Sequence, residues 1–104
     1  VIGIIFMNYW LSQVDTGMGM KYIMQTIDRL VRFGGVDVVG IGSDFDGFTD
    51  PPDEITDSSQ MPRLTRELAS VMRSPSSVKY DDRAIAKMLG GNSLRLLRNG
   101  WGRP

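Results

Sequence analysis

Apolar positions along the chain follow two patterns, uninterrupted runs and a helical repeat. Residues 1–10 are apolar without strict alternation, which predicts a strand buried on both faces. In residues 20–33 apolar side chains recur on one helical face, and Gly34-Gly35 is expected to end that helix. A second short apolar run, at residues 36–41, predicts another strand. The order strand, helix, strand predicts a βαβ unit, in which the two strands are parallel.

The segment after the second strand is polar and irregular. Residues 42–52 are rich in Gly and Asp and end in two prolines, so a long loop is expected there. Pro62 suits the first turn of a helix that reaches about residue 73, with Leu64 and Leu68 on its inner side. A polar linker is expected at residues 74–78.

Two more helices are expected in the last quarter of the chain. Asp81 is predicted to be the N-cap of a short helix, which Gly90-Gly91 closes, and Asn92 to cap the final helix. The tail is expected to fray except where Trp101 covers a surface. The prediction is therefore an α/β fold with two parallel strands and about four helices.

Composition narrows the possible chemistry. The 104 residues suffice for one modest domain, and 12 basic and 12 acidic side chains give a formal net charge of zero. That balance argues against nucleic acid as a partner, because binding phosphates needs a basic field. The chain has neither Cys nor His, which excludes a Ser-His-Asp triad, a Cys-His pair and a Cys- or His-ligated zinc site within it.

The first residues bear on location and completeness. The apolar stretch at residues 1–10 is about half as long as a membrane helix requires, and no basic segment precedes it. No signal or membrane segment is therefore expected, and the cytoplasm is favoured. Because the chain opens inside an apolar run without an initiating Met, residues 1–104 are expected to be a single incomplete domain cut from a longer protein.

Acidic residues are concentrated after the second strand. Residues 44–57 hold six acids and no base, and they begin at the carboxyl end of that strand, where parallel α/β proteins bind ligands. The spacing of Asp44 and Asp46 alone supports two interpretations equally well: an exposed functional pair of carboxylates, or a plain Asx turn. A non-catalytic α/β module that binds a cation or a basic partner through residues 44–57 is the alternative to an enzyme.

Two strings carry a resemblance to a known family. Val-Gly-Ile-Gly-Ser-Asp-Phe-Asp-Gly at residues 39–47 resembles the last-strand motif of the renal, or membrane, dipeptidase family of zinc peptidases. Residues 86–97, with their Leu-Gly-Gly-Asn turn, resemble that family's C-terminal pattern, and residues 1–8 are similar to its preceding strand. The resemblance implies the C-terminal βαβα part of a (β/α)8 TIM barrel, which when complete takes about 250 residues.

The family resemblance also implies an activity. Members hydrolyse dipeptides with a metal-activated water, and their two zinc ions are held by residues of earlier strands that this chain lacks. Asp44 would take the proton of the water, pass it to the leaving amine and engage the amino group of the substrate. Tyr9 and Trp10, at the end of the first strand, would touch the substrate.

The remaining expectations concern the loop and the isolated chain. The loop would be structured by Asp46, Gly42 and Gly47, with Phe45 and Phe48 packed beneath it. Without metal ligands the chain alone is expected to hold no zinc and to be inactive. The open edges of a two-stranded sheet further predict association, for instance as a homo-oligomer.

Overall fold

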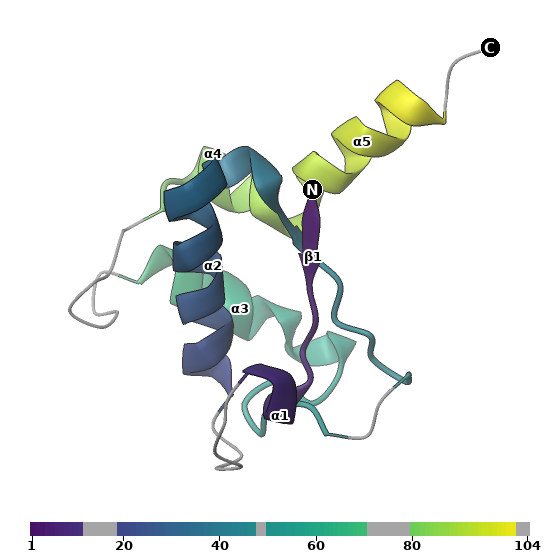
Figure 1. The fold of residues 1–104 in the computed structure, drawn as a ribbon. Coiled ribbons are helices and arrows are strands. Elements are labelled where there is room, and N and C mark those ends of the chain that lie inside the picture. Colours follow the sequence, from purple (N-terminus) through teal and green to yellow (C-terminus); the bar gives the residue numbers. More distant parts are fainter. Residues whose placement is uncertain (12–18, 48–49, 71–79, 102–104) are drawn as a thin grey trace.

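Two short parallel strands joined by a long helix form the centre of the molecule. A computed structural model of the chain describes residues 1–11, 19–47, 50–70 and 80–101. Strand β1 (Ile2–Ile4) pairs with β2 (Val39–Ile41), and helix α2 (Met20–Gly34) connects them, lying alongside β1 in Figure 1. The α/β class, the βαβ unit and the parallel pairing are confirmed.

Helices surround this pair. The other α-helices of the described ranges are α1 (Asn8–Leu11), α3 (Met61–Ala69), α4 (Asp82–Ala86) and α5 (Asn92–Gly100). Shorter turns are the 3-10 segments Val36–Val38 and Ser58–Gln60 and a π-helical segment, Lys87–Gly91. Within the described part of the chain, no helix is long and apolar enough to pass through a bilayer.

The core lies where α2, α3 and α4 meet the sheet. The inner face predicted for α2 is confirmed by the complete burial of Ile23 and Ile27, and that of α3 by the burial of Leu64 and Leu68. Gly35, with φ 79°, follows α2 in a conformation that only glycine adopts easily. The Asp81 carboxylate accepts a hydrogen bond from the amide of Ala84 at 2.8 Å, which confirms the predicted N-cap of α4.

The first strand is shorter than the sequence predicts. Only Ile2–Ile4 pairs with β2, and Ile2 is 53% exposed, so the predicted ten-residue strand buried on both faces is wrong. Phe6 and Met7 leave the strand and enter the core, at 2% and 1% exposure. An uninterrupted apolar run indicates that a segment is buried, but it does not determine which of its residues pair with a neighbouring strand. The second strand is also shorter than predicted. Residues 36–38 form a 3-10 turn, and the pairing with β1 begins at Val39.

The predicted break at Gly90-Gly91 is also wrong. Helix α4, the π-helical segment and α5 follow one another without interruption. Asn92 therefore caps no helix, and its completely buried side chain instead donates hydrogen bonds to the carbonyl oxygens of Val36 and Val39 at 2.7 and 2.8 Å. These bonds, with the burial of Met88, outweigh a glycine cost of about 1 kcal/mol per residue in a helix.

Helix α5 leaves the body of the molecule (Figure 1). Leu94 and Leu97 are 45% and 48% exposed, and Trp101 is 82% exposed, so the expectation that Trp101 covers a surface is wrong. The linker predicted at residues 74–78, and Phe48, lie outside the described residues.

Candidate functional site

Asp44 stands just beyond the carboxyl end of β2. Gly42 and Ser43 follow the strand, and Asp44 then adopts a left-handed backbone with φ 60°. Its side chain is exposed, as expected for a group that meets a ligand from solvent. Because β1 and β2 are parallel, the segments that follow both strands lie at this end of the sheet.

A tight turn holds Asp44. The Gly47 amide donates to the Asp44 carbonyl oxygen at 3.0 Å, which closes a turn over residues 44–47. Asp46 is the third residue of this turn. Its φ of 68° is positive, as a type II turn requires at the third position. Aspartate tolerates left-handed backbone better than most residues, so both carboxylates occur at positions where their residue type is suited to the backbone.

The turn is attached to the end of β1. Phe45 is half-buried and its ring meets that of Phe6 edge to face, with centroids 5.6 Å apart and planes at 78°. The Phe6 amide donates to the Ser43 carbonyl oxygen at 3.1 Å, which continues the contact between the two segments past the sheet. Phe45 thus packs beneath the loop, as predicted, and fixes the turn to a buried residue.

At Gly42 the backbones of the two segments lie close together. A Cβ placed on Gly42 would lie 3.3 Å from two main-chain atoms of Gly3, closer than most side chains come to any neighbour. The Gly42 amide also donates to the carbonyl oxygen of Ile4 at 3.0 Å. The loop therefore starts from a main-chain contact that a larger residue would disturb.

The aromatic pair expected at the rim lies in a helix rather than in a strand. Tyr9 and Trp10 belong to α1, the single turn that follows β1 at the same end of the sheet as Asp44. Trp10 is 67% exposed. The correction follows from the short pairing of β1, which ends five residues before Tyr9.

The acids of residues 44–57 do not form one cluster. Glu54 accepts a hydrogen bond at 3.3 Å from the amide of Met20, the first residue of α2. Asp57 accepts hydrogen bonds from the hydroxyl and the amide of Ser59, and these hold its pKa below the ordinary value. The carboxylate of Asp46 makes no hydrogen bond to any described residue, so the Asx-type bonds expected of it are not seen there.

No metal site is formed by the part of the chain that the structure describes. In residues 1–11, 19–47, 50–70 and 80–101, no group of three or more acidic side chains is arranged to hold an ion. The chain has no His or Cys to add a ligand. Among the described residues, this arrangement gives no support to a cation site in the acidic loop, which is one of the two options of the alternative interpretation; the other option is a basic partner.

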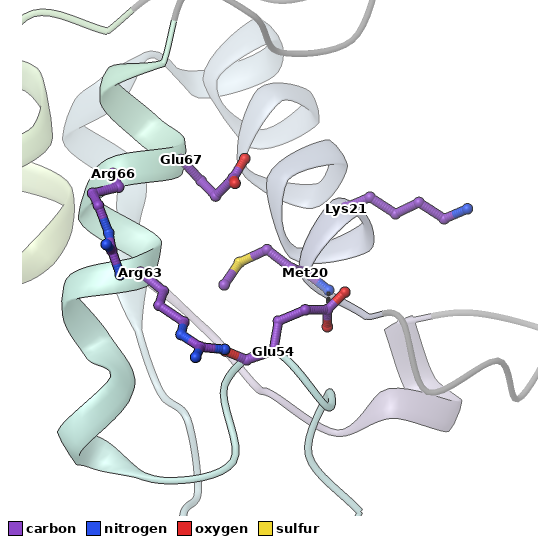
Figure 2. A pocket seen from close by; sticks show the side chains of 6 residues that line it. All are labelled: Met20, Lys21, Glu54, Arg63, Arg66 and Glu67. Carbon is purple, nitrogen blue, oxygen red and sulfur yellow. Dashed lines mark hydrogen bonds between the residues drawn. The ribbon is translucent and has the colours of Figure 1, made fainter.

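A separate pocket of about 500 Å³ opens between α2 and α3, lined by Met20, Lys21, Glu54, Arg63, Arg66 and Glu67. Figure 2 shows the Glu54 carboxylate at the first amide of α2 and Arg63 beside it, where one guanidinium nitrogen donates to the Glu54 carbonyl oxygen at 3.0 Å. Lys21 extends away from the other side chains in that view. The lining mixes both signs of charge and includes no residue of the Asp44 turn, so no chemistry is assigned to this pocket.

Sequence reasoning missed the polar network that joins the C-terminal helices to the turn before β2. Asp37 pairs with Lys87 at 2.8 Å, and Arg95 donates to the Asp37 carbonyl oxygen and to Asn92 at 2.8 and 2.9 Å. The residue that could have indicated this network is Asn92, because it is polar and lies one helical turn after the apolar Met88. The two carbonyl oxygens to which Asn92 donates lie more than 50 positions away and could not be predicted from the sequence.

Comparison with known proteins agrees with the motifs at residues 39–47. The family model described as membrane dipeptidase, peptidase family M19, matches residues 1–100. A Klebsiella pneumoniae protein described as an "Uncharacterized protein in pqqA 5'region" is 36% identical over an alignment 104 residues long, which covers 97% of this chain. The match spans only 35% of that relative, about a third of its length. No solved structure gives a significant match.

The match to the family model runs through both strands, the Asp44 turn and the C-terminal helices. The chain therefore belongs to the membrane dipeptidase family, peptidase family M19.

Proposed function

We propose that these residues form the end of a (β/α)8 dipeptidase barrel, in which Asp44 is the carboxylate that transfers the proton. The observation that carries the proposal is the place of Asp44, exposed on a turn directly beyond the carboxyl end of a parallel strand. Catalytic groups of (β/α)8 enzymes come from this end of the strands. Membership in a peptidase family supplies the reaction class, hydrolysis.

The chemistry needs one group that both accepts and donates a proton. When water attacks the peptide carbonyl it must lose a proton, and the departing amine must gain one. An ionised Asp44 accepts the first proton and delivers it to the amine nitrogen, which returns the carboxylate to its starting state. Proton transfer by a placed side chain is worth about 10²–10⁴ in rate.

The substrate adds two further contacts to the proposal. A dipeptide carries a free ammonium group, which an ionised Asp44 carboxylate attracts by a charge-assisted hydrogen bond. Trp10, exposed on α1 at the same end of the sheet, and Tyr9 beside it in sequence would contact substrate side chains.

The zinc ions implied by the family would have to be held outside this chain. Its described residues offer no set of metal ligands, and it has no His or Cys, so the residues present do not fit a zinc pair. We therefore propose that the 104 residues alone do not hydrolyse dipeptides and that activity requires the remainder of a barrel.

The test is a chimera in which residues 1–100 replace the matching segment of an active family member. Asp44→Asn should lower kcat by about 10²–10⁴ while the zinc content stays near that of the parent. Asp53→Asn is the matched control, because Asp53 is an exposed acid of the same loop. Unchanged turnover in the Asp44 variant would remove the proposed role.

A further inference from the structure

The carboxylate of Asp44 folds back over its own turn onto the α-carbon of Gly47. A Cβ placed on Gly47 would lie 2.1 Å from Oδ1 and 2.8 Å from Cγ of Asp44. Both distances are far below van der Waals contact. The position of the carboxylate is therefore open only because residue 47 has no side chain.

A positive φ is not the reason for a glycine at position 47. The left-handed torsions of this turn fall on Asp44 and Asp46, at φ 60° and 68°. Among the glycines of the described ranges, positive φ occurs at Gly35 and not at Gly47. The atom nearest to the place of a side chain at position 47 is Oδ1 of Asp44, so the absence of that side chain leaves the space that the carboxylate occupies.

We propose that Gly47 is a positioning residue for the Asp44 carboxylate. The inference rests on the proposed function, since it concerns the same carboxylate. Asp44 itself is exposed, and its side chain makes no hydrogen bond to a residue that the structure describes. In its observed rotamer the carboxylate fills the space above Gly47, and a side chain at position 47 would close that space.

The rest of the turn resists displacement. Phe45 is held against Phe6, and the Ser43 carbonyl oxygen is bonded to the Phe6 amide. A methyl group at position 47 would lie 3.2 Å from the Asp44 carbonyl oxygen, so that oxygen would have to move away by a few tenths of an ångström. The carboxylate of Asp44 overlaps the methyl group much more and would have to move further. It can do so at little cost, because it can rotate into solvent. Gly47→Ala should therefore keep the fold and expel the carboxylate.

Two measurements on Gly47→Ala test the proposal. In the isotopically labelled 104-residue chain, the three-bond couplings from backbone nitrogen and carbonyl carbon to Asp44 Cγ should report a change of χ1 rotamer. In the chimera described above, kcat should fall by about 10²-fold, the effect expected of a misplacement near 1 Å, with zinc content and Tm close to those of the parent. Gly90→Ala is the control, because a Cβ at Gly90 meets nothing within 4 Å.

The outcomes separate this inference from the proposed function. Unchanged couplings in Gly47→Ala, or unchanged kcat where Asp44→Asn is inactive, would overturn the positioning role and leave the role of Asp44 standing. A large drop of Tm in Gly47→Ala would also overturn it, since the glycine would then be structural. If Asp44→Asn retains full turnover, the proposed function fails and the positioning role in catalysis fails with it.

Discussion

The side-chain amide of Asn92 donates a hydrogen bond to the main-chain carbonyl of Val39, 2.8 Å away, at the first residue of β2. A second bond reaches the carbonyl of Val36 at 2.7 Å. One buried side chain thus fixes the start of the C-terminal helix α5 to the turn from which β2 begins. An amide is suited to this position because it supplies two donors and one acceptor, and Arg95 uses the acceptor at 2.9 Å.

Replacing Asn92 by Ala should lower the free energy of unfolding by about 2–3 kcal/mol, because buried polar groups are left without partners. Urea denaturation followed by circular dichroism measures the change. Asn99→Ala is the control, since Asn99 is an exposed residue of the same helix, and it should shift stability by less than about 0.5 kcal/mol. Equal effects of the two variants would show that the Asn92 bonds carry no net stability.

The Asp37–Lys87 pair should give stability a defined pH dependence. The hydrogen bond and charge of Lys87, aided by Arg95 and Arg83, hold the pKa of Asp37 below its ordinary value of 3.8. A folded-state pKa below the unfolded value adds stability above the unfolded pKa, and this is lost as pH falls through the folded pKa. The Tm difference between the native chain and Asp37→Asn should therefore be present above about pH 5 and vanish at lower pH.

Salt provides a second check on this pair. Both partners are accessible to solvent, so the Tm difference at neutral pH should shrink as ionic strength rises. Asp53→Asn serves as the control, because no described residue bonds to Asp53. A difference between native chain and Asp37→Asn that persists in acid would contradict the assignment.

The two carboxylates of the turn should differ in importance. In the chimera, Asp46→Asn should lower kcat by less than about tenfold, against the much larger loss expected of Asp44→Asn. Asparagine tolerates the left-handed backbone of residue 46, so the turn is retained. Turnover of both variants under the same conditions decides the order, and the reverse order would exchange their roles.

Zinc should not remain on the isolated chain. After incubation with zinc and dialysis, metal analysis should find far less than one equivalent, because stable zinc sites use about four ligands, mostly His and Cys. Adding a chelator should leave Tm unchanged, since folding then owes nothing to a bound ion. Retention of one or two equivalents would show that the acidic side chains form a site after all.

Sequence patterns predicted best what depends on neighbouring residues. The helical repeat of Ile23 and Ile27 lies within one segment, and so does the capping geometry of Asp81. The length of β1 depends instead on how many residues of β2 pair with it. This number cannot be predicted from a run of apolar residues in β1. The continuity of the last helix likewise depends on the distant partners of Asn92.

The candidate site shows the same division. The place of Asp44 beyond a strand could be predicted from the sequence, because its motif follows an apolar run directly; its role stays a prediction. The space above Gly47 could not, since a motif records that a glycine is present and not which atoms occupy the place of its side chain. Likewise, Glu54 is one of six acids in its segment, and only the structure identifies it as the acceptor for the first amide of α2.

The approach of Gly3 to Gly42 has a consequence for protein engineering. The contact, the bond from Gly42 to Ile4 and the bond from Phe6 to Ser43 all involve main-chain atoms, and they lead directly to Asp44. Their geometry depends little on the other side chains of either strand. Residues 3–6 and 42–47 therefore constitute a transplantable unit, which should present a carboxylate in the same place when grafted onto neighbouring parallel strands of another scaffold.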